Sequence, residues 1–209
     1  MNERLIRQHD LLQPTELDIH IVGCGGIGSW TTLAIAKMGY KNITVYDFDS
    51  VEDHNVATQF FRADQVGCTK AQALSDNVMD FTGTRINIVS DRPDNITGDV
   101  LIMAVDTMAS REELKVLIPN FQFIVDTRMG GQVFNIWSFL PFEADRYEGT
   151  LFTDEEGVQE PCTARAIAYN VFGIASMIGN LVKRYDRNEP MPFELNGDYV
   201  NLRLDHTKF

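Results

Sequence analysis

Apolar runs alternate with helical patterns along the first 126 residues of the chain. The apolar run Asp18 to Val22 ends at a cluster of glycines, and a helical pattern follows from Ile27 to Met38. Gly39 stands in the C-cap position of that helix, and the next apolar run covers Asn42 to Tyr46. This alternation predicts strands joined by right-handed helical crossovers, and therefore a mostly parallel sheet.

The remaining pattern extends this order to the C-terminus. Helices are predicted at Lys70 to Met79, Arg111 to Ile118 and Ala164 to Tyr185, and strands at Arg85 to Val89, Val100 to Val105, Phe121 to Asp126, Gln132 to Phe139 and Tyr199 to Leu204. The predicted fold class is α/β. We expect a Rossmann-like, mostly parallel sheet with helices on both faces, plus antiparallel strands toward the C-terminus.

The chain contains no clear linker, so we expect residues 1–209 to form a single domain. Residues 1–17 are predicted to form an N-terminal arm. Residues 50–61 are predicted to form a loop with a short helix. The polar, turn-rich segment 141–161 is predicted to be an exposed, mobile loop.

Charge and cysteine content narrow the possible functions. Acidic residues outnumber basic ones by 30 to 18, for a formal net charge of -12. A nucleic-acid duplex or a membrane surface would repel this balance, so neither is an expected partner. The 3 cysteines are far apart and form no CxxC pair, which argues against disulfides and against zinc. The N-terminus is polar, unlike a signal peptide, and we expect a cytoplasmic protein.

A glycine fingerprint follows the first predicted strand. Gly23, Gly25 and Gly28 have the spacing GxGxxG and open a helix, where backbone N–H groups can approach a phosphate. Asp47 ends the second strand and can accept hydrogen bonds from ribose hydroxyls. The pattern predicts an adenine-nucleotide site. The alternative is a turn that is rich in glycine for packing reasons alone.

Two further residues favour ATP over a dinucleotide. Lys70 stands at the start of a predicted helix and could supply a positive charge to a triphosphate. Asp106 follows a predicted strand at the edge of the sheet where such folds bind ligands, and a carboxylate there can hold Mg²⁺. Each residue alone is more simply a solvated surface group. Together with the glycine turn they form a phosphate-binding set.

An ordered series of motifs resembles the ThiF/MoeB/HesA family, the bacterial relatives of the ubiquitin-activating enzymes. The motifs are Gly23-Cys-Gly-Gly-Ile-Gly-Ser29, Tyr46-Asp-Phe-Asp49-x-Val51, Asn55-x-x-x-Gln59, Lys70, Val105-Asp106 through Arg111, Arg128-Met-x-Gly-Gln132 and Cys162-Thr-Ala. They cover nearly the whole chain in the family's order. The absence of the family's paired CxxC motifs indicates a minimal form without zinc.

The resemblance implies a role for each matching residue. Gly25 and Gly26 would line the phosphate turn, and Asp47 would bind the ribose. The other implied roles are triphosphate contacts for Asn55 and Lys70, Mg²⁺ binding and control of attack at the α-phosphate for Asp106, and a contact across a dimer to the γ-phosphate for Arg7. Asp49 could assist the metal or be a solvated acid.

One position departs from the family pattern. Thr58 stands where the family has an arginine, so one positive charge near the transferred phosphate is missing. Removing one such donor typically costs roughly 10²–10³ in rate. Arg62 would lie one helical turn from Thr58, and either Arg62 or Arg7 could compensate. Otherwise the enzyme is slow or is a non-catalytic relative.

Cys162 has two interpretations that stay open. At a helix start the dipole would lower the thiol pKa, and in the thiamin branch of the family a cysteine at the matching position joins the carrier through sulfur. Equally, it could be a small buried residue. We interpret the other cysteines and the histidines as structural or solvated, namely Cys24, Cys68, His9, His20, His54 and His206.

The family resemblance implies an ATP-dependent adenylyltransferase with Mg²⁺. It would activate the C-terminal carboxylate of a small ubiquitin-like or sulfur-carrier protein ending in Gly-Gly, and it would act as a homodimer. Within the adenylating class, a peptide C-terminus and a tRNA carboxylate stay open as substrates, although the acidic charge weighs against tRNA. Two alternatives from other classes remain. An NAD- or FAD-dependent oxidoreductase explains the residues from Gly23 to Asp47 equally well, but not Lys70 or Asp106. A non-catalytic partner of a ubiquitin-like protein is consistent with Thr58.

Overall fold

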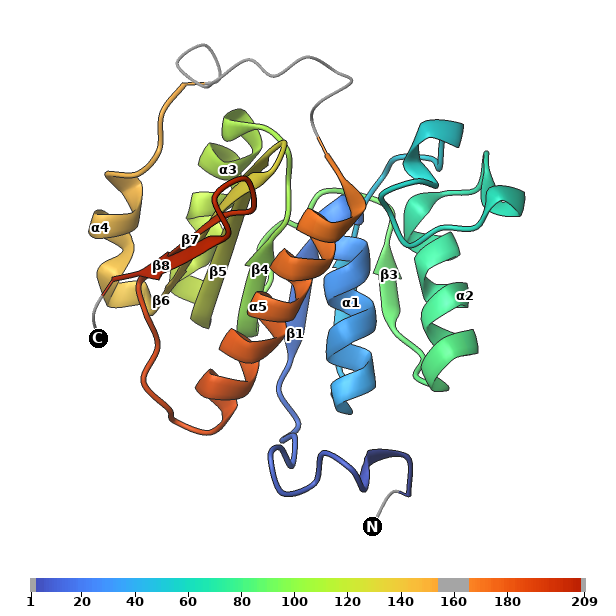
Figure 1. Cartoon of the computed structure of the whole chain (residues 1–209), viewed down its shortest axis with the longest axis horizontal. Coiled ribbons are helices and arrows are strands. Elements are labelled where there is room, and N and C mark those ends of the chain that lie inside the picture. The colour runs from blue at the N-terminus through green and yellow to red at the C-terminus, as the bar shows by residue number, and fades with distance from the viewer. Residues whose placement is uncertain (1–2, 154–165, 208–209) are drawn as a thin grey trace.

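One sheet of eight strands forms the centre of the protein (Figure 1). The computed structural model describes residues 3–153 and 166–207. The strands are β1 (Ile19–Val22), β2 (Ile43–Tyr46), β3 (Asn87–Val89), β4 (Gly98–Met103), β5 (Phe121–Gly130), β6 (Val133–Phe139), β7 (Glu194–Asp198) and β8 (Arg203–His206). Their order in the sheet is β3-β2-β1-β4-β5-β6-β7-β8.

The pairing of the strands confirms the predicted fold class. β3, β2, β1, β4 and β5 pair in parallel, and β6, β7 and β8 add antiparallel strands at the C-terminal side. Because β2 and β4 both flank β1, the strand order reverses beside β1, and ligands in such sheets bind at the carboxyl ends of the strands at that point. The glycine fingerprint lies at this end of β1.

Helices cover both faces of the sheet. They are α1 (Gly26–Met38), α2 (Lys70–Thr82), α3 (Met108–Leu114), α4 (Ala144–Glu148) and α5 (Ala168–Asp186), with short 3-10 segments η1 (Glu3–Leu5), η2 (Asp53–Asn55), η3 (Ala63–Gln65), η4 (Lys115–Asn120) and η5 (Pro141–Glu143). Figure 1 shows α1 and α5 side by side on one face. No helix in the described residues is long and apolar enough to cross a membrane.

The side chains of β4 show how the sheet divides the core. Val100 and Ile102 pack into the cluster that contains residues of α1, α2 and α5. Leu101 and Met103 pack into the second cluster, with residues of α3, η4 and α4. Alternate side chains of a strand point to opposite faces, so the apolar residues 100–103 of β4 serve two core layers at once.

Several predicted elements differ from the structure, and the helix predicted at Arg111 to Ile118 begins at Met108 and continues after Leu114 as the 3-10 segment η4. The predicted strand Tyr199 to Leu204 is wrong over its first four residues, which form the turn between β7 and β8. The carboxylate of Asp198 accepts hydrogen bonds from the backbone N–H groups of Val200 and Asn201, at 2.9 and 3.0 Å, and these bonds stabilise a turn. The alternation of apolar residues along 199–204 gave no sign of these side-chain hydrogen bonds, and the strand was predicted in place of the turn.

The predicted loop 141–161 is also partly wrong. Its first residues form η5 and α4, because Tyr147 is fully buried and stacks on Phe139 at 4.6 Å between ring centroids. Residues 154–161 lie outside the described part of the chain. The long C-terminal helix begins at Ala168, four residues later than predicted.

The N-terminal arm packs on the helix ends opposite the glycine turn. The side-chain amide of Gln8 donates to the carbonyl of Met38 at 2.8 Å, and the Arg4 guanidinium donates to the carbonyl of Thr82 at 2.9 Å. Both carbonyls belong to the last turns of helices, where free backbone acceptors need donors. The arm is therefore tied to the C-terminal ends of α1 and α2 (Figure 1).

Candidate functional site

The glycine turn between β1 and α1 is close-packed at two positions and open at a third. Gly23 has φ +96°, and a Cβ there would lie 2.6 Å from the carbonyl oxygen of Ala104. A Cβ on Gly28 would lie 1.8 Å from the carbonyl oxygen of Gly23. In contrast, a Cβ on Gly25 would meet nothing within 4 Å. Gly23 and Gly28 thus let the turn form, whereas Gly25 leaves space above the helix start.

That space lies at the N-terminus of α1. Gly25 is the N-cap residue, and the helix starts at Gly26. Since glycine has no side chain, it cannot cap the first N–H groups of the helix as serine or aspartate would. A helix start with open N–H groups and a positive dipole end can bind an anion such as a phosphate.

Asp47 is fixed against the glycine turn. Its Oδ2 accepts a hydrogen bond from the backbone N–H of Cys24 at 2.6 Å, and its Oδ1 accepts one from the N–H of Asp49 at 2.8 Å. Burial raises the pKa of the Asp47 carboxyl, while these two N–H donors and the Lys70 charge lower it. The residue therefore joins the end of β2 to the turn, as a ribose-binding acid requires.

Lys70 faces the same place from the start of α2. Its Nζ forms an ion pair with Oδ2 of Asp49 at 2.8 Å, and its backbone N–H donates to the carbonyl of Asp49 at 2.8 Å. The Lys70 charge lowers the pKa of the Asp47 carboxyl and also acts on the Cys24 thiol, whose pKa burial raises. The lysine is thus within electrostatic reach of the glycine turn.

Asn55 lies in a loop that is held beside the start of α2. A β-bridge joins Ser50 to Thr69, and the N–H of Val51 donates to the carbonyl of Cys68 at 2.8 Å. The side chain of Asn55 is buried, and its amide oxygen accepts a hydrogen bond from the N–H of Glu52 at 2.9 Å. The structure therefore brings Asn55 to the Lys70 side of the site.

Asp106 stands at the carboxyl end of β4, beside the glycine turn. Val105 follows Ala104, whose atoms would lie 2.6 and 3.4 Å from a Cβ placed on Gly23 and Gly28. Asp106 itself is exposed. The described residues contain no group of three or more His, Cys, Asp or Glu that could hold a metal. Mg²⁺ usually binds through one or two carboxylates plus substrate phosphates, so a single exposed carboxylate beside a phosphate site fits it.

A buried cluster of charges lies next to Asp106, and the sequence analysis did not predict it. Asp126 is fully buried between Arg111 and Arg128, and each arginine Nε donates to one carboxylate oxygen at 2.9 Å. The signal was present in the sequence. Asp126 and Arg128 are two residues apart in a strand and so share a face, on which Ile124 is also buried.

Two predicted site residues point elsewhere within this chain. Arg7 is exposed on the arm, at the other end of α1, and a helix of 13 residues is about 20 Å long. The Arg62 guanidinium donates to Oδ1 of Asn77 at 2.6 Å and forms an ion pair with Asp64 at 3.0 Å. The premise that one helical turn separates Thr58 from Arg62 is wrong, because these residues form turns and bends.

Thr58 itself lies near the helix start. Its carbonyl accepts a hydrogen bond from Nε1 of Trp30 at 3.0 Å, and it is 3.9 Å from a Cβ placed on Gly26. The position where the family has an arginine is therefore beside the site. Cys162 lies outside the described residues.

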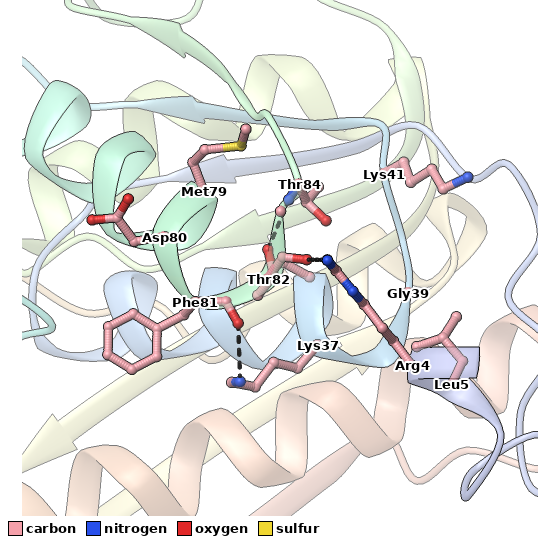
Figure 2. A pocket seen from close by; sticks show the side chains of 12 residues that line it. Arg4, Leu5, Lys37, Gly39, Lys41, Met79, Asp80, Phe81, Thr82 and Thr84 are labelled. Atoms are coloured by element: carbon pink, nitrogen blue, oxygen red, sulfur yellow. Dashed lines mark hydrogen bonds between the residues drawn. The ribbon is translucent and has the colours of Figure 1, made fainter. Parts of the chain in front are cut away.

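A separate pocket of about 540 Å³ lies between the arm and the C-terminal ends of α1 and α2 (Figure 2). Arg4 and Lys37 point into it and donate to the carbonyls of Thr82 and Phe81, at 2.9 and 3.5 Å. None of the predicted site residues lines this pocket, and its basic groups already serve the helix ends. We therefore place the candidate site at the glycine turn.

Comparison with known proteins assigns the chain to a family. The model of the ThiF family matches residues 2–128, more than half of the chain. The chain belongs to the ThiF family. The matched range contains the glycine turn, Asp47, Lys70 and Asp106, which confirms the family resemblance found in the sequence.

Curated relatives of this ThiF-family chain match over limited stretches. Ubiquitin-like modifier-activating enzyme 5 of Arabidopsis thaliana is 43% identical over 58 residues, 28% of this chain and 14% of that protein. The tRNA threonylcarbamoyladenosine dehydratase of Escherichia coli is 33% identical over 97 residues, 44% of this chain and 36% of that protein. The chain thus covers well under half of either relative.

Solved structures share the fold over nearly the whole ThiF-family chain. MccB of Escherichia coli with succinimide gives a TM-score of 0.79 at 15% identity, covering 100% of this chain and 72% of that one. MccB with ATP gives a TM-score of 0.76 at 15% identity, covering 99% and 72%. At this identity the likeness shows the fold alone.

Proposed function

We propose that this protein uses ATP to adenylate the C-terminal carboxylate of a small ubiquitin-like or sulfur-carrier protein that ends in Gly-Gly. The observation that carries the proposal is the convergence of Asp47 and Lys70 on the open helix start at Gly25. Membership of the ThiF family and the relative named as a ubiquitin-like modifier-activating enzyme support it.

The proposed chemistry needs positioning and charge neutralisation rather than a covalent enzyme intermediate. An oxygen of the carrier's carboxylate attacks the α-phosphorus of ATP, the bond to the bridging oxygen breaks, and pyrophosphate leaves. The Asp47 carboxylate accepts hydrogen bonds from the ribose hydroxyls, and the N–H groups at the start of α1 donate to phosphate oxygens. Lys70 neutralises negative charge on the triphosphate. Asp106 would hold Mg²⁺, which would supply positive charge to neutralise the phosphates.

The missing charge at Thr58 is supplied, in this proposal, by Arg7 of a second copy. The face formed by α1, α5 and the arm carries a groove of about 750 Å³. Leu11 and Phe172 line it and are 70% and 46% exposed. If two copies pack α1 against α1 in antiparallel fashion, the arm of each copy meets the glycine turn of the other. Apolar side chains left exposed on this face support such a homodimer.

Nucleotide binding separates this proposal from the oxidoreductase alternative. We expect ATP with Mg²⁺ to raise the melting temperature and NAD or FAD to leave it unchanged. The Lys70→Ala variant serves as the matched control, because the protection by ATP should fall while the fold stays intact. Protection by NAD, or equal protection of the wild type and Lys70→Ala by ATP, contradicts the proposal.

A non-catalytic role is the second candidate. The contacts of Arg62 with Asn77 and Asp64 favour it, because they direct that guanidinium away from the position that Thr58 leaves uncharged. Such a protein would bind a ubiquitin-like carrier and ATP without catalysing exchange of pyrophosphate.

A further inference from the structure

We propose that Arg111 is a positioning residue that fixes the loop carrying Asp106. The inference rests on the proposed function, in which Asp106 holds Mg²⁺ at the phosphates. The evidence is a fork of hydrogen bonds around this loop. Nη2 of Arg111 donates to the carbonyl of Val105 at 2.6 Å, and Nη1 donates to the carbonyl of Thr107 at 3.0 Å. These two carbonyls belong to the residues directly before and after Asp106.

The fork is itself held rigidly. Nε of Arg111 donates to Oδ1 of Asp126 at 2.9 Å, and Nη2 also donates to the carbonyl of Thr127 at 2.6 Å. The side chains of Arg111 and Asp126 are 3% and 0% exposed. The second oxygen of Asp126 is bound by Arg128 at 2.9 Å, so the carboxylate cannot rotate freely. The orientation of Arg111 is therefore fixed by β5.

Hydrogen bonds anchor the loop that carries Asp106 at both of its ends. Before Asp106, the N–H of Ala104 donates to the carbonyl of Val22 at 2.8 Å. After it, Thr107 caps α3, since its Oγ1 accepts a hydrogen bond from the N–H of Ser110 at 3.1 Å. Between these points Arg111 contacts both carbonyls that flank the exposed carboxylate. The geometry holds the backbone of Asp106 in place while the Asp106 side chain stays open to solvent.

A guanidinium suits this role better than an ammonium. It is planar and presents five N–H donors in a rigid fork, whereas lysine has a single flexible charge. Arg111→Lys keeps the positive charge beside Asp126 but cannot bond two flanking carbonyls and the carboxylate together. Arg128→Lys is the matched control, because it keeps a positive charge beside Asp126, and the hydrogen bond that it loses runs to the carbonyl of Thr150, at 2.7 Å, and not to the Asp106 loop.

Calorimetric titration with ATP tests the proposal through the effect of Mg²⁺ on affinity. The ratio of ATP affinities with Mg²⁺ and with EDTA is measured for each variant. In Asp106→Ala we expect Mg²⁺ no longer to raise the affinity for ATP, so that the effect on the ratio is lost. In Arg111→Lys we expect the ratio to fall about 10-fold, as is typical when the support of a metal ligand is removed. The affinity in EDTA stays unchanged in both variants, and Arg128→Lys keeps the wild-type ratio.

The outcomes separate this inference from the proposed function. If Asp106→Ala loses the ratio and Arg111→Lys keeps it, the positioning role is overturned and the proposed function stands. If the wild type does not bind ATP, or Asp106→Ala keeps the ratio, both are overturned. In the double variant Asp106→Ala with Arg111→Lys, the ratio should fall no further than in Asp106→Ala alone, and a further fall contradicts action through Asp106.

A second variant covers the case in which Arg111→Lys does not fold. Arg111→Gln leaves Asp126 paired with Arg128, so the buried carboxylate keeps a cationic partner. The expected loss of the Mg²⁺ ratio is the same as in Arg111→Lys. A wild-type ratio in Arg111→Gln contradicts the positioning role.

Discussion

Two opposing effects act on the Asp47 carboxyl. Burial at the end of β2 raises its pKa, whereas hydrogen bonds from the N–H groups of Cys24 and Asp49, and the charge of Lys70, lower it. Burial is the larger effect, so the pKa lies above the ordinary value of an aspartate, about 4. An acid in this setting responds to a ligand that donates hydrogen bonds to its charged form.

The affinity for ATP should therefore depend on the protonation of Asp47. A ribose hydroxyl donates to the ionised carboxylate, so bound ATP lowers the pKa of Asp47. By linkage, affinity is highest above the raised pKa of the free protein and falls as the pH drops through that pKa. Calorimetric titration from about pH 7 down toward about pH 4 should show this fall in the wild type.

The control for this prediction is Asp47→Asn, which has no charge to lose. ATP itself gains protons over the same range, and the two proteins share that contribution. The ratio of their affinities should therefore shrink as the pH falls. A constant ratio would show that Asp47 does not contact the nucleotide.

For single residues, the sequence predicted which ones lie near the site better than it predicted where their side chains point. The places of Gly23 and Asp47 after neighbouring strands were enough to predict that Asp47 meets the glycine turn, because the ends of neighbouring parallel strands share one edge. The direction of Arg62 could not be predicted, since it depends on Asn77, Asp64 and the non-helical backbone between them.

Among the elements, the turn from β1 to α1 combines two functions of glycine. Gly28 allows the first turn of the helix to pack on the carbonyl of Gly23, and Gly25 leaves the helix start open. Both residues belong to one fingerprint. An added methyl group at Gly28 is therefore expected to lower stability, whereas one at Gly25 is expected to weaken ligand binding.

Gly28→Ala and Gly25→Ala form a matched pair that tests this division. Gly28→Ala forces a clash with the backbone and should lower the free energy of unfolding by roughly 1–3 kcal/mol. Gly25→Ala meets open space and should change it by less than about 0.5 kcal/mol. We expect Gly25→Ala to weaken ATP binding, because its methyl group occupies the space proposed for a phosphate.

Urea denaturation and ATP titration of both variants provide the measurement. Equal losses of stability in the two variants would contradict the packing argument. Full ATP affinity in Gly25→Ala would place the phosphates elsewhere.

The strands and helices up to Asp126 could be predicted because each is a short periodic segment bounded by glycine, proline or polar residues. The C-terminal elements were harder to predict. β5 continues to Gly130 because its last residues pair with β6, and the turn at 199–202 follows from the carboxylate of Asp198. Such contacts between side chain and backbone, or between distant strands, leave little periodic signal.

For the whole molecule, the separation of Arg7 from the glycine turn is the main structural fact. The arm that carries Arg7 is bound to the C-terminal end of α1 through Gln8, whereas the site is at the N-terminal end of the same helix. One chain alone therefore does not bring Arg7 to the proposed phosphate site. The proposed function requires a second copy if this arginine takes part.

Mixing two inactive variants tests whether Arg7 acts between copies. Arg7→Ala and Lys70→Ala should each lower pyrophosphate exchange by roughly 10²–10³. In a mixed dimer, one site carries both changes and the other carries neither, so mixing should restore activity. Arg7 is exposed, and Arg7→Ala should leave the melting temperature unchanged. No recovery after exchange of subunits is confirmed by a mass tag would contradict action in trans.

The most direct test of the central claim is exchange of radiolabelled pyrophosphate into ATP. The protein is incubated with Mg²⁺, ATP and a panel of small carrier proteins ending in Gly-Gly, beside the same carriers lacking the last glycine. We expect exchange that requires an intact carrier terminus and falls by roughly 10²–10³ in Lys70→Ala. Tight ATP binding with no exchange across the panel, or exchange that persists without any carrier, would contradict it.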